Sequence, residues 1–158
     1  MAVETANVDL AMETLAADVV LNSPLTNQFR FEGHEELRHL LELASEAFED
    51  IRFHTVVGEG PTWALFYTAR IGNQDFEEAQ LMRLNEQGKI VEATLMIRPL
   101  PAQTALMDTI GPQLARRFGL SRAVAALMPM MLKPLAFLAR VVDRRGVSMV
   151  KPHRDGER

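Results

Sequence analysis

The spacing of apolar and polar residues predicts helices near both ends of the chain and strands between them. From Val8 to Val20 apolar residues recur at helical spacing, and the segment leads into a short strand, 18–21, that Pro24 closes. A second short strand, 28–31, precedes Gly33. The helix predicted after Gly33 has one apolar stripe, formed by Leu37, Leu40, Leu41, Ala44 and Phe48.

A four-stranded antiparallel meander is predicted after Asp50. Its strands are expected at 51–57, 63–71, 76–84 and 89–98, because the segments between them have turn-forming compositions. Pro99 and Pro101 end the sheet, since a proline cannot donate a ladder hydrogen bond.

The remainder of the chain is predicted to be helical. Helical segments are expected at 103–110, 113–118, 121–128 and 134–143, with a frayed end beyond Gly146. Pro129 and Pro134 predict that the last two segments are separate helices.

The last hairpin of the meander predicts one apolar face. If 85–88 is the loop, Met82 lies opposite Val91 and Gln80 lies opposite Ala93. The face expected to wall a core or pocket then carries Gln80, Met82, Leu84, Val91, Ala93, Leu95 and Ile97. The other face is mixed, and on it Arg98 is expected to pair with Glu92.

Composition indicates one globular domain. The 158 residues are 47% hydrophobic and 24% charged, which fits neither a disordered nor a fibrous protein. The absence of cysteine excludes disulfides, thiol nucleophiles and thiolate metal sites. Because the first fifteen residues lack a basic start and an apolar core, the expected location is cytoplasmic.

Charge is divided unevenly along the chain. Residues 1–112 hold 7 Lys/Arg against 18 Asp/Glu, a net −11, and residues 113–158 hold 10 against 3, a net +7. The basic part is expected to dock on an acidic face of its own or a partner subunit, or, as a possibility for 113–145, to rest on an anionic membrane surface. Nucleic acid is not an expected partner, because this part has no Tyr or Trp to stack on bases.

Several strings, taken in order, resemble the nuclear transport factor 2-like (SnoaL-like) superfamily, which includes ketosteroid isomerase-like folds. They are 15–24 (LAADVVLNSP), 31–37 (FEGHEEL), 48–50 (FED), 81–90 (LMRLNEQGKI) and 97–100 (IRPL). The resemblance covers about residues 5–105 and implies an α+β fold, a cone-shaped curved antiparallel sheet packed against N-terminal helices. It further implies a SnoaL-like pocket domain at 1–105, to which this chain adds a helical C-terminal extension at 106–145 and a flexible tail at 146–158.

The resemblance also implies a pocket and a homodimer formed through the outer sheet face, with Arg83, Glu92 and Met96 as interface candidates. Members of the superfamily include isomerases, polyketide cyclases, epoxide hydrolases and non-catalytic binding domains, so the fold alone assigns no reaction. Two positions depart from the ketosteroid isomerase pattern. Ser23 stands where the proton-shuttling carboxylate precedes the proline, and Gln80 stands where related chains carry an acid.

Our leading hypothesis from the sequence is an apolar or amphipathic small-molecule pocket with Gln80 as its polar anchor. Asn22 is expected to line the pocket beside Gln80, and His54 is a weak candidate for acid-base catalysis. No cofactor and no metal site are predicted; His34 and His39 are five residues apart, so they point in different directions on a helix. The alternatives are an isomerase, cyclase or hydrolase, and an interaction or membrane-peripheral protein acting through the basic C-terminal helices.

Overall fold

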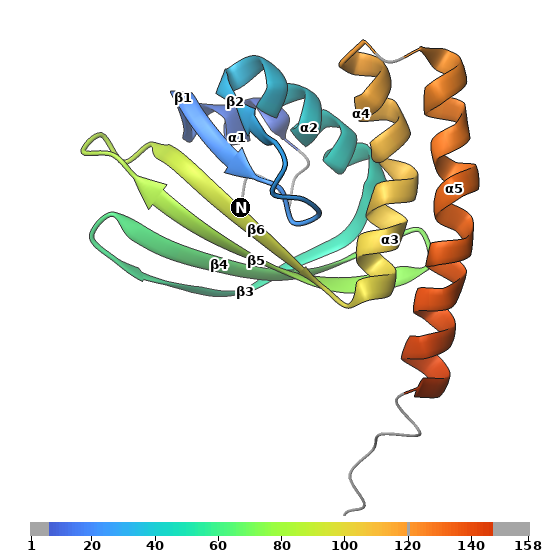
Figure 1. Ribbon diagram of the computed structural model, residues 1–158. Coiled ribbons are helices and arrows are strands. Elements are labelled where there is room, and N and C mark those ends of the chain that lie inside the picture. Colours follow the sequence, from blue (N-terminus) through green and yellow to red (C-terminus); the bar gives the residue numbers. More distant parts are fainter. Residues whose placement is uncertain (1–6, 120, 147–158) are drawn as a thin grey trace, which may run out of the picture.

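A computed structural model describes residues 7–119 and 121–146. It confirms the predicted α+β class: one curved six-stranded sheet carries helices against its concave side (Figure 1). The strand order is β2-β1-β6-β5-β4-β3. The sheet is open, and the C-terminal helices stand beside the other helices rather than forming a separate body (Figure 1).

The first helix is shorter than its periodicity suggests. α1 (Val8–Glu13) begins where the Asn7 side chain accepts a hydrogen bond from the Leu10 amide, and it ends at Thr14, whose amide and hydroxyl both donate to Ala11. β1 (Leu15–Asn22) therefore starts three residues earlier than expected. β1 pairs in parallel with β6 and antiparallel with β2 (Arg30–Glu32).

α2 (Gly33–Ala47) follows the predicted apolar stripe and packs across β1. It starts at Gly33, whose φ of 75° favours glycine. Leu37 and Leu43 are buried beneath it, and Glu35 and Glu36 lie in its first turn, where the helix dipole stabilises them.

The meander forms as predicted; its first three strands are longer than expected, and the last begins one residue later. β3 (Phe48–Glu59), β4 (Thr62–Ile71), β5 (Gln74–Leu84) and β6 (Ile90–Arg98) pair antiparallel in sequence order. The expected register of the last hairpin is wrong: Met82 lies opposite Ala93 and Gln80 opposite Leu95. A β-bulge next to Leu84 inserts an extra residue into β6, and sequence alternation does not reveal such an insertion.

The C-terminal part forms α3 (Leu100–Thr109), α4 (Gly111–Arg117) and α5 (Arg122–Val141), followed by a π-helical turn, η1 (Val142–Gly146). The expected break between two last helices is wrong, because α5 continues through Pro129 and Pro134. Each proline removes only one backbone donor, and α5 packs along α3 and α4 with Ala136 and Ala139 buried, which offsets that loss. The predicted frayed end beyond Gly146 lies outside the described residues.

Two buried clusters form the core between the sheet and the helices. The larger joins β4, β5 and β6 to α2, α3 and Ile110, and the smaller joins β1 and β2 to α2. Members of both clusters line one common cavity, so the cavity lies between them. Within the described residues, no helix is both long and apolar enough to cross a membrane.

Candidate functional site

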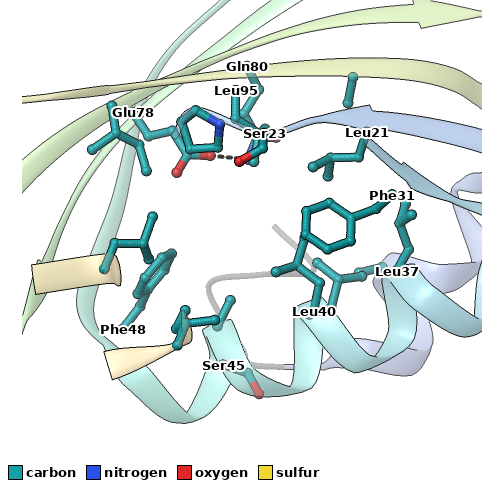
Figure 2. A pocket seen from close by; sticks show the side chains of 18 of the residues that line it. Leu21, Ser23, Phe31, Leu37, Leu40, Ser45, Phe48, Glu78, Gln80 and Leu95 are labelled. Carbon is teal, nitrogen blue, oxygen red and sulfur yellow. Dashed lines mark hydrogen bonds between the residues drawn. The ribbon is translucent and has the colours of Figure 1, made fainter. Parts of the chain in front are cut away.

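A cavity of about 780 Å³ lies between the concave face of the sheet and the helices. Its wall is almost entirely hydrocarbon, with Phe, Leu, Ile and Met side chains from the sheet, α2, α3 and α4. Figure 2 shows Phe31, Leu37 and Leu40 across the space from Glu78, with Phe48 at the lower left below Glu78. Its size and apolar lining are those of a small-molecule site.

Glu78 is the acidic residue of this wall. It lies in the middle of β5, is only 2% exposed, and its carboxyl group reaches the cavity (Figure 2). Gln80, two residues along the same face of the strand, donates from Nε2 to Glu78 Oε1 at 2.7 Å. The Tyr67 hydroxyl makes a second hydrogen bond to the carboxyl group from the neighbouring strand β4, where Tyr67 pairs with Glu78.

Burial in this apolar wall raises the pKa of Glu78 from 4.5 to about 7. The hydrogen bonds from Gln80 and Tyr67 act in the opposite direction, since they stabilise the carboxylate, but desolvation is the larger effect. The carboxyl group can therefore gain and lose a proton near neutral pH, which is the property a general acid or base needs.

Tyr67 remains a hydrogen-bond donor throughout the physiological range. The pKa of its phenol is well above 10.0, first because the side chain is buried and second because the charge of Glu78 lies beside it. A neutral phenol and a neutral amide thus hold the carboxylate of Glu78 between them, and neither competes with it for the proton.

Helices α3 and α4 close one side of the cavity. Leu106, Met107, Ile110, Leu114 and Phe118 contribute to the wall. α4 is fastened to α2 by an ion pair between Arg117 and Glu42 at 2.9 Å, and Phe118 stacks 6.2 Å from Phe31 of β2. α3 and α4 therefore form part of the cavity wall.

Five residues of the predicted apolar face line the cavity: Gln80, Met82, Ala93, Leu95 and Ile97. Val91 does not, because the bulge in β6 shifts alternation there and places Ile90 in the wall. Leu84 lies beyond the cavity, in a shallow hollow between the ends of the strands.

Asn22 and His54 do not line the cavity. Asn22 donates to Glu92 Oε1 at 3.1 Å and to Thr94 Oγ1 at 3.0 Å, on the outer face of the sheet. It is Ser23, the next residue, that reaches the cavity wall.

Strand alternation also turns His54 outward, while Phe53 points into the cavity. The His54 side chain is 40% exposed, and its Nε2 atom lies 3.4 Å from Glu77. Arg98 lies on this outer face too, but it pairs with Glu77 on β5 rather than with Glu92.

Glu78 and Tyr67 were not predicted from the sequence, although a signal for Glu78 is present. Glu78 and Gln80 are two residues apart, so the alternation that places Gln80 on the concave face of the strand also places Glu78 there. For Tyr67 the corresponding signal is the alternation of Leu65, Tyr67, Ala69 and Ile71 along β4. Between residues 7 and 146, excluding 120, no three His, Asp or Glu side chains converge as a metal site would require.

Comparison with known proteins supports the predicted superfamily. A model of the SnoaL-like domain matches residues 1–93. The fold resembles a steroid delta-isomerase from Pseudomonas aeruginosa, with 23% identity and a TM-score of 0.67 over 75% of this chain and 88% of that one. An uncharacterised protein with a cystatin-like fold from Silicibacter pomeroyi matches with 27% identity and a TM-score of 0.67 over 73% and 83%.

A more distant structure is an epoxide hydrolase/cyclase-like enzyme with a role in pyran ring formation in the polyether salinomycin. It matches with 17% identity and a TM-score of 0.53 over 61% of this chain and 81% of that one. No match is found among curated proteins. At this identity the structural likeness shows the fold, and the chemistry has to be argued from the site.

Proposed function

Because the chain belongs to the SnoaL-like domain family, we propose that it binds a neutral, apolar small molecule in the cavity and moves a proton on that molecule through Glu78. The observation that carries the proposal is a carboxyl group that is 2% exposed on the wall of an apolar cavity and has a pKa of about 7. A surface carboxylate has a much lower pKa and is a far weaker base.

Glu78 is suited to act first as a base. Gln80 and Tyr67 both donate to its carboxyl group, so they orient the carboxylate and favour the ionised state from which it can accept a proton. The carboxylate takes a proton from the ligand, the bonding electron pair stays on the ligand, and the proton returns to another ligand atom. The net reaction is an isomerisation or an internal cyclisation, with Glu78 regenerated.

The wall also restricts the ligand. Among the residues that the structure describes, no Lys, Arg or His lines the cavity, so an anionic group would be desolvated without a counter-ion beside the charge of Glu78. A neutral ring system with one carbonyl or hydroxyl group near Glu78 fits this wall. The steroid isomerase and the pyran-forming enzyme among the structural neighbours suggest steroid-like and polyether-like probes.

Ligand binding without chemistry is the second candidate. It is favoured by Ser23 and Gln80, which stand where ketosteroid isomerases and related chains carry acids. In that case the buried Glu78 would be a hydrogen-bonding anchor for a ligand hydroxyl.

The two candidates are separated by a solvent-exchange experiment on wild-type protein and the Glu78→Gln variant. The protein is incubated in D₂O with a steroid β,γ-unsaturated ketone, and deuterium incorporation and isomerisation are followed by NMR. We expect the wild type to incorporate deuterium and the variant to lose at least about 100-fold in rate, the usual contribution of a general base.

Binding is measured on the same samples by native mass spectrometry. Retained binding by Glu78→Gln with lost exchange supports proton transfer, whereas wild-type binding without exchange supports the binding-only candidate for that ligand class. Absence of both binding and exchange across neutral steroid and polyether probes contradicts the proposal. Glu59→Gln, an exposed carboxylate at the end of β3, serves as the matched control.

A further inference from the structure

The outward face of α5 is apolar and is not covered by any other described element. Where α5 packs on α3 and α4, the buried side chains among those that the structure describes are the small residues Ala136 and Ala139. On the opposite side, large apolar side chains are exposed to solvent: Met130 is 70% exposed, Phe137 61% and Leu138 56%, and Leu135 is nearly half exposed. A soluble monomer seldom gathers such residues on one helix face without a use for them.

The arrangement of these residues is that of an interfacial helix. At about 100° per residue, Phe137, Met130, Leu138 and Leu135 share an arc of roughly 160°. Lys133, which is exposed, and Arg140, which is partly buried, lie together at the Phe137 edge of that arc. A broad apolar face with cations along its border lets the apolar chains enter an acyl layer while the cations meet phosphate groups.

The part of the chain that contains α5 carries a net positive charge. Residues 113–158 carry a net +7 and residues 1–112 a net −11, so α5 belongs to the basic part of the chain. A negatively charged surface attracts the α5 side and repels the sheet side. Because no described helix can cross a membrane, the contact is a surface contact.

We propose that the outward face of α5 binds an anionic lipid surface, with the helix lying in the plane of the membrane. A second copy of the chain is a poorer occupant, since pairing two such faces would bring Lys133 and Arg140 of both copies into one border. None of the α5 side chains that the structure describes lines the cavity, so this surface is separate from the site around Glu78.

Vesicle co-sedimentation tests this surface with the full-length protein. The vesicles are phosphatidylcholine alone or an equimolar mixture of phosphatidylcholine and phosphatidylglycerol. We expect binding to the mixed vesicles that weakens with added salt, and little binding to phosphatidylcholine. The double substitution Phe137→Gln with Leu138→Gln is expected to weaken binding at least about tenfold, because two large side chains no longer enter the acyl layer.

Val56→Thr with Val57→Thr is the matched control, since it removes two exposed apolar side chains from the tip of β3 and should bind as the wild type does. Circular dichroism verifies that each variant folds. Failure of the wild type to bind the mixed vesicles overturns the proposal, as does equal binding by the α5 variant. A wild-type dimer that the α5 substitutions dissociate, without any vesicle binding, would instead assign this face to a second copy.

Discussion

Replacing Glu78 with glutamine is expected to stabilise the protein in alkaline solution and to change little in mild acid. The pKa of Glu78 is raised from 4.5 to about 7 by folding, so the folded state favours the protonated carboxyl group. The wild type is therefore most stable below pH 4.5 as far as this group is concerned, and it loses stability as the pH rises through about 7. Glutamine keeps the shape and the hydrogen-bonding capacity but does not ionise, so the variant has no such loss.

The size of the effect follows from the shift. A change of one pKa unit corresponds to about 1.36 kcal/mol, so the wild type should lose roughly 3 kcal/mol in the free energy of unfolding between mild acid and alkaline pH. Because Glu78 is 2% exposed, solvent screening reduces this value little. For a chain of this size the loss corresponds to roughly 6 to 12 °C in Tm.

Thermal unfolding followed by circular dichroism, from about pH 4 to pH 9, measures this difference. The Tm of Glu78→Gln minus that of the wild type should rise across the range; Glu59→Gln, at an exposed position, is the control variant. A Glu78→Gln difference that is independent of pH would show that Glu78 has an ordinary pKa, and the argument for it as a base near neutrality would fail.

Three further predictions concern the cavity, a turn and the outer sheet face. Ala93→Phe puts a ring into the cavity, so it is expected to abolish binding of neutral steroid probes in isothermal calorimetry. Its Tm in thermal unfolding should stay within a few degrees of the wild-type value. Undiminished binding would mean that the ligand binds outside the cavity. Gly58→Ala is expected to lower the free energy of unfolding by about 1 to 3 kcal/mol in urea, because the added methyl group would lie 2.5 Å from the Thr62 carbonyl oxygen and 2.7 Å from Trp63. An unchanged urea midpoint would mean that the backbone around Gly58 accommodates the methyl group without cost. Leu81 is 43% exposed on the outer sheet face, through which the family resemblance implies a homodimer. Leu81→Asp should therefore convert a dimer to a monomer in light scattering. A wild-type protein that is already a monomer would refute that expectation.

The sequence predicts the fold well because its signals are local. Glycine- and asparagine-containing turns separate the four meander strands, and the apolar stripe after Gly33 fits a helix lying on a sheet. The misplaced features depend on tertiary context instead. The bulge in β6 is stabilised by the whole sheet, and the continuity of α5 through two prolines is stabilised by packing on α3 and α4.

The candidate site is predicted in outline but not in its chemistry. Alternation places Gln80 on the concave face, and the structure shows that face to be the cavity wall. The same alternation cannot say which face of β3 is concave, so the sequence leaves His54 a candidate, whereas in the structure Phe53 faces the cavity. In the sequence, Glu77 and Glu78 are adjacent and chemically identical, and the concave sheet with the helices packed on it buries Glu78.

The most direct test of the central claim is an NMR titration of the Glu78 side-chain carboxyl carbon, with and without progesterone as a neutral apolar ligand. We expect a midpoint of about 7 that moves upward when the ligand fills the cavity and excludes water, and Glu59, an exposed residue, serves as the control. A Glu78 midpoint near 4.5, or a midpoint that does not respond to a ligand shown to be bound, would contradict it.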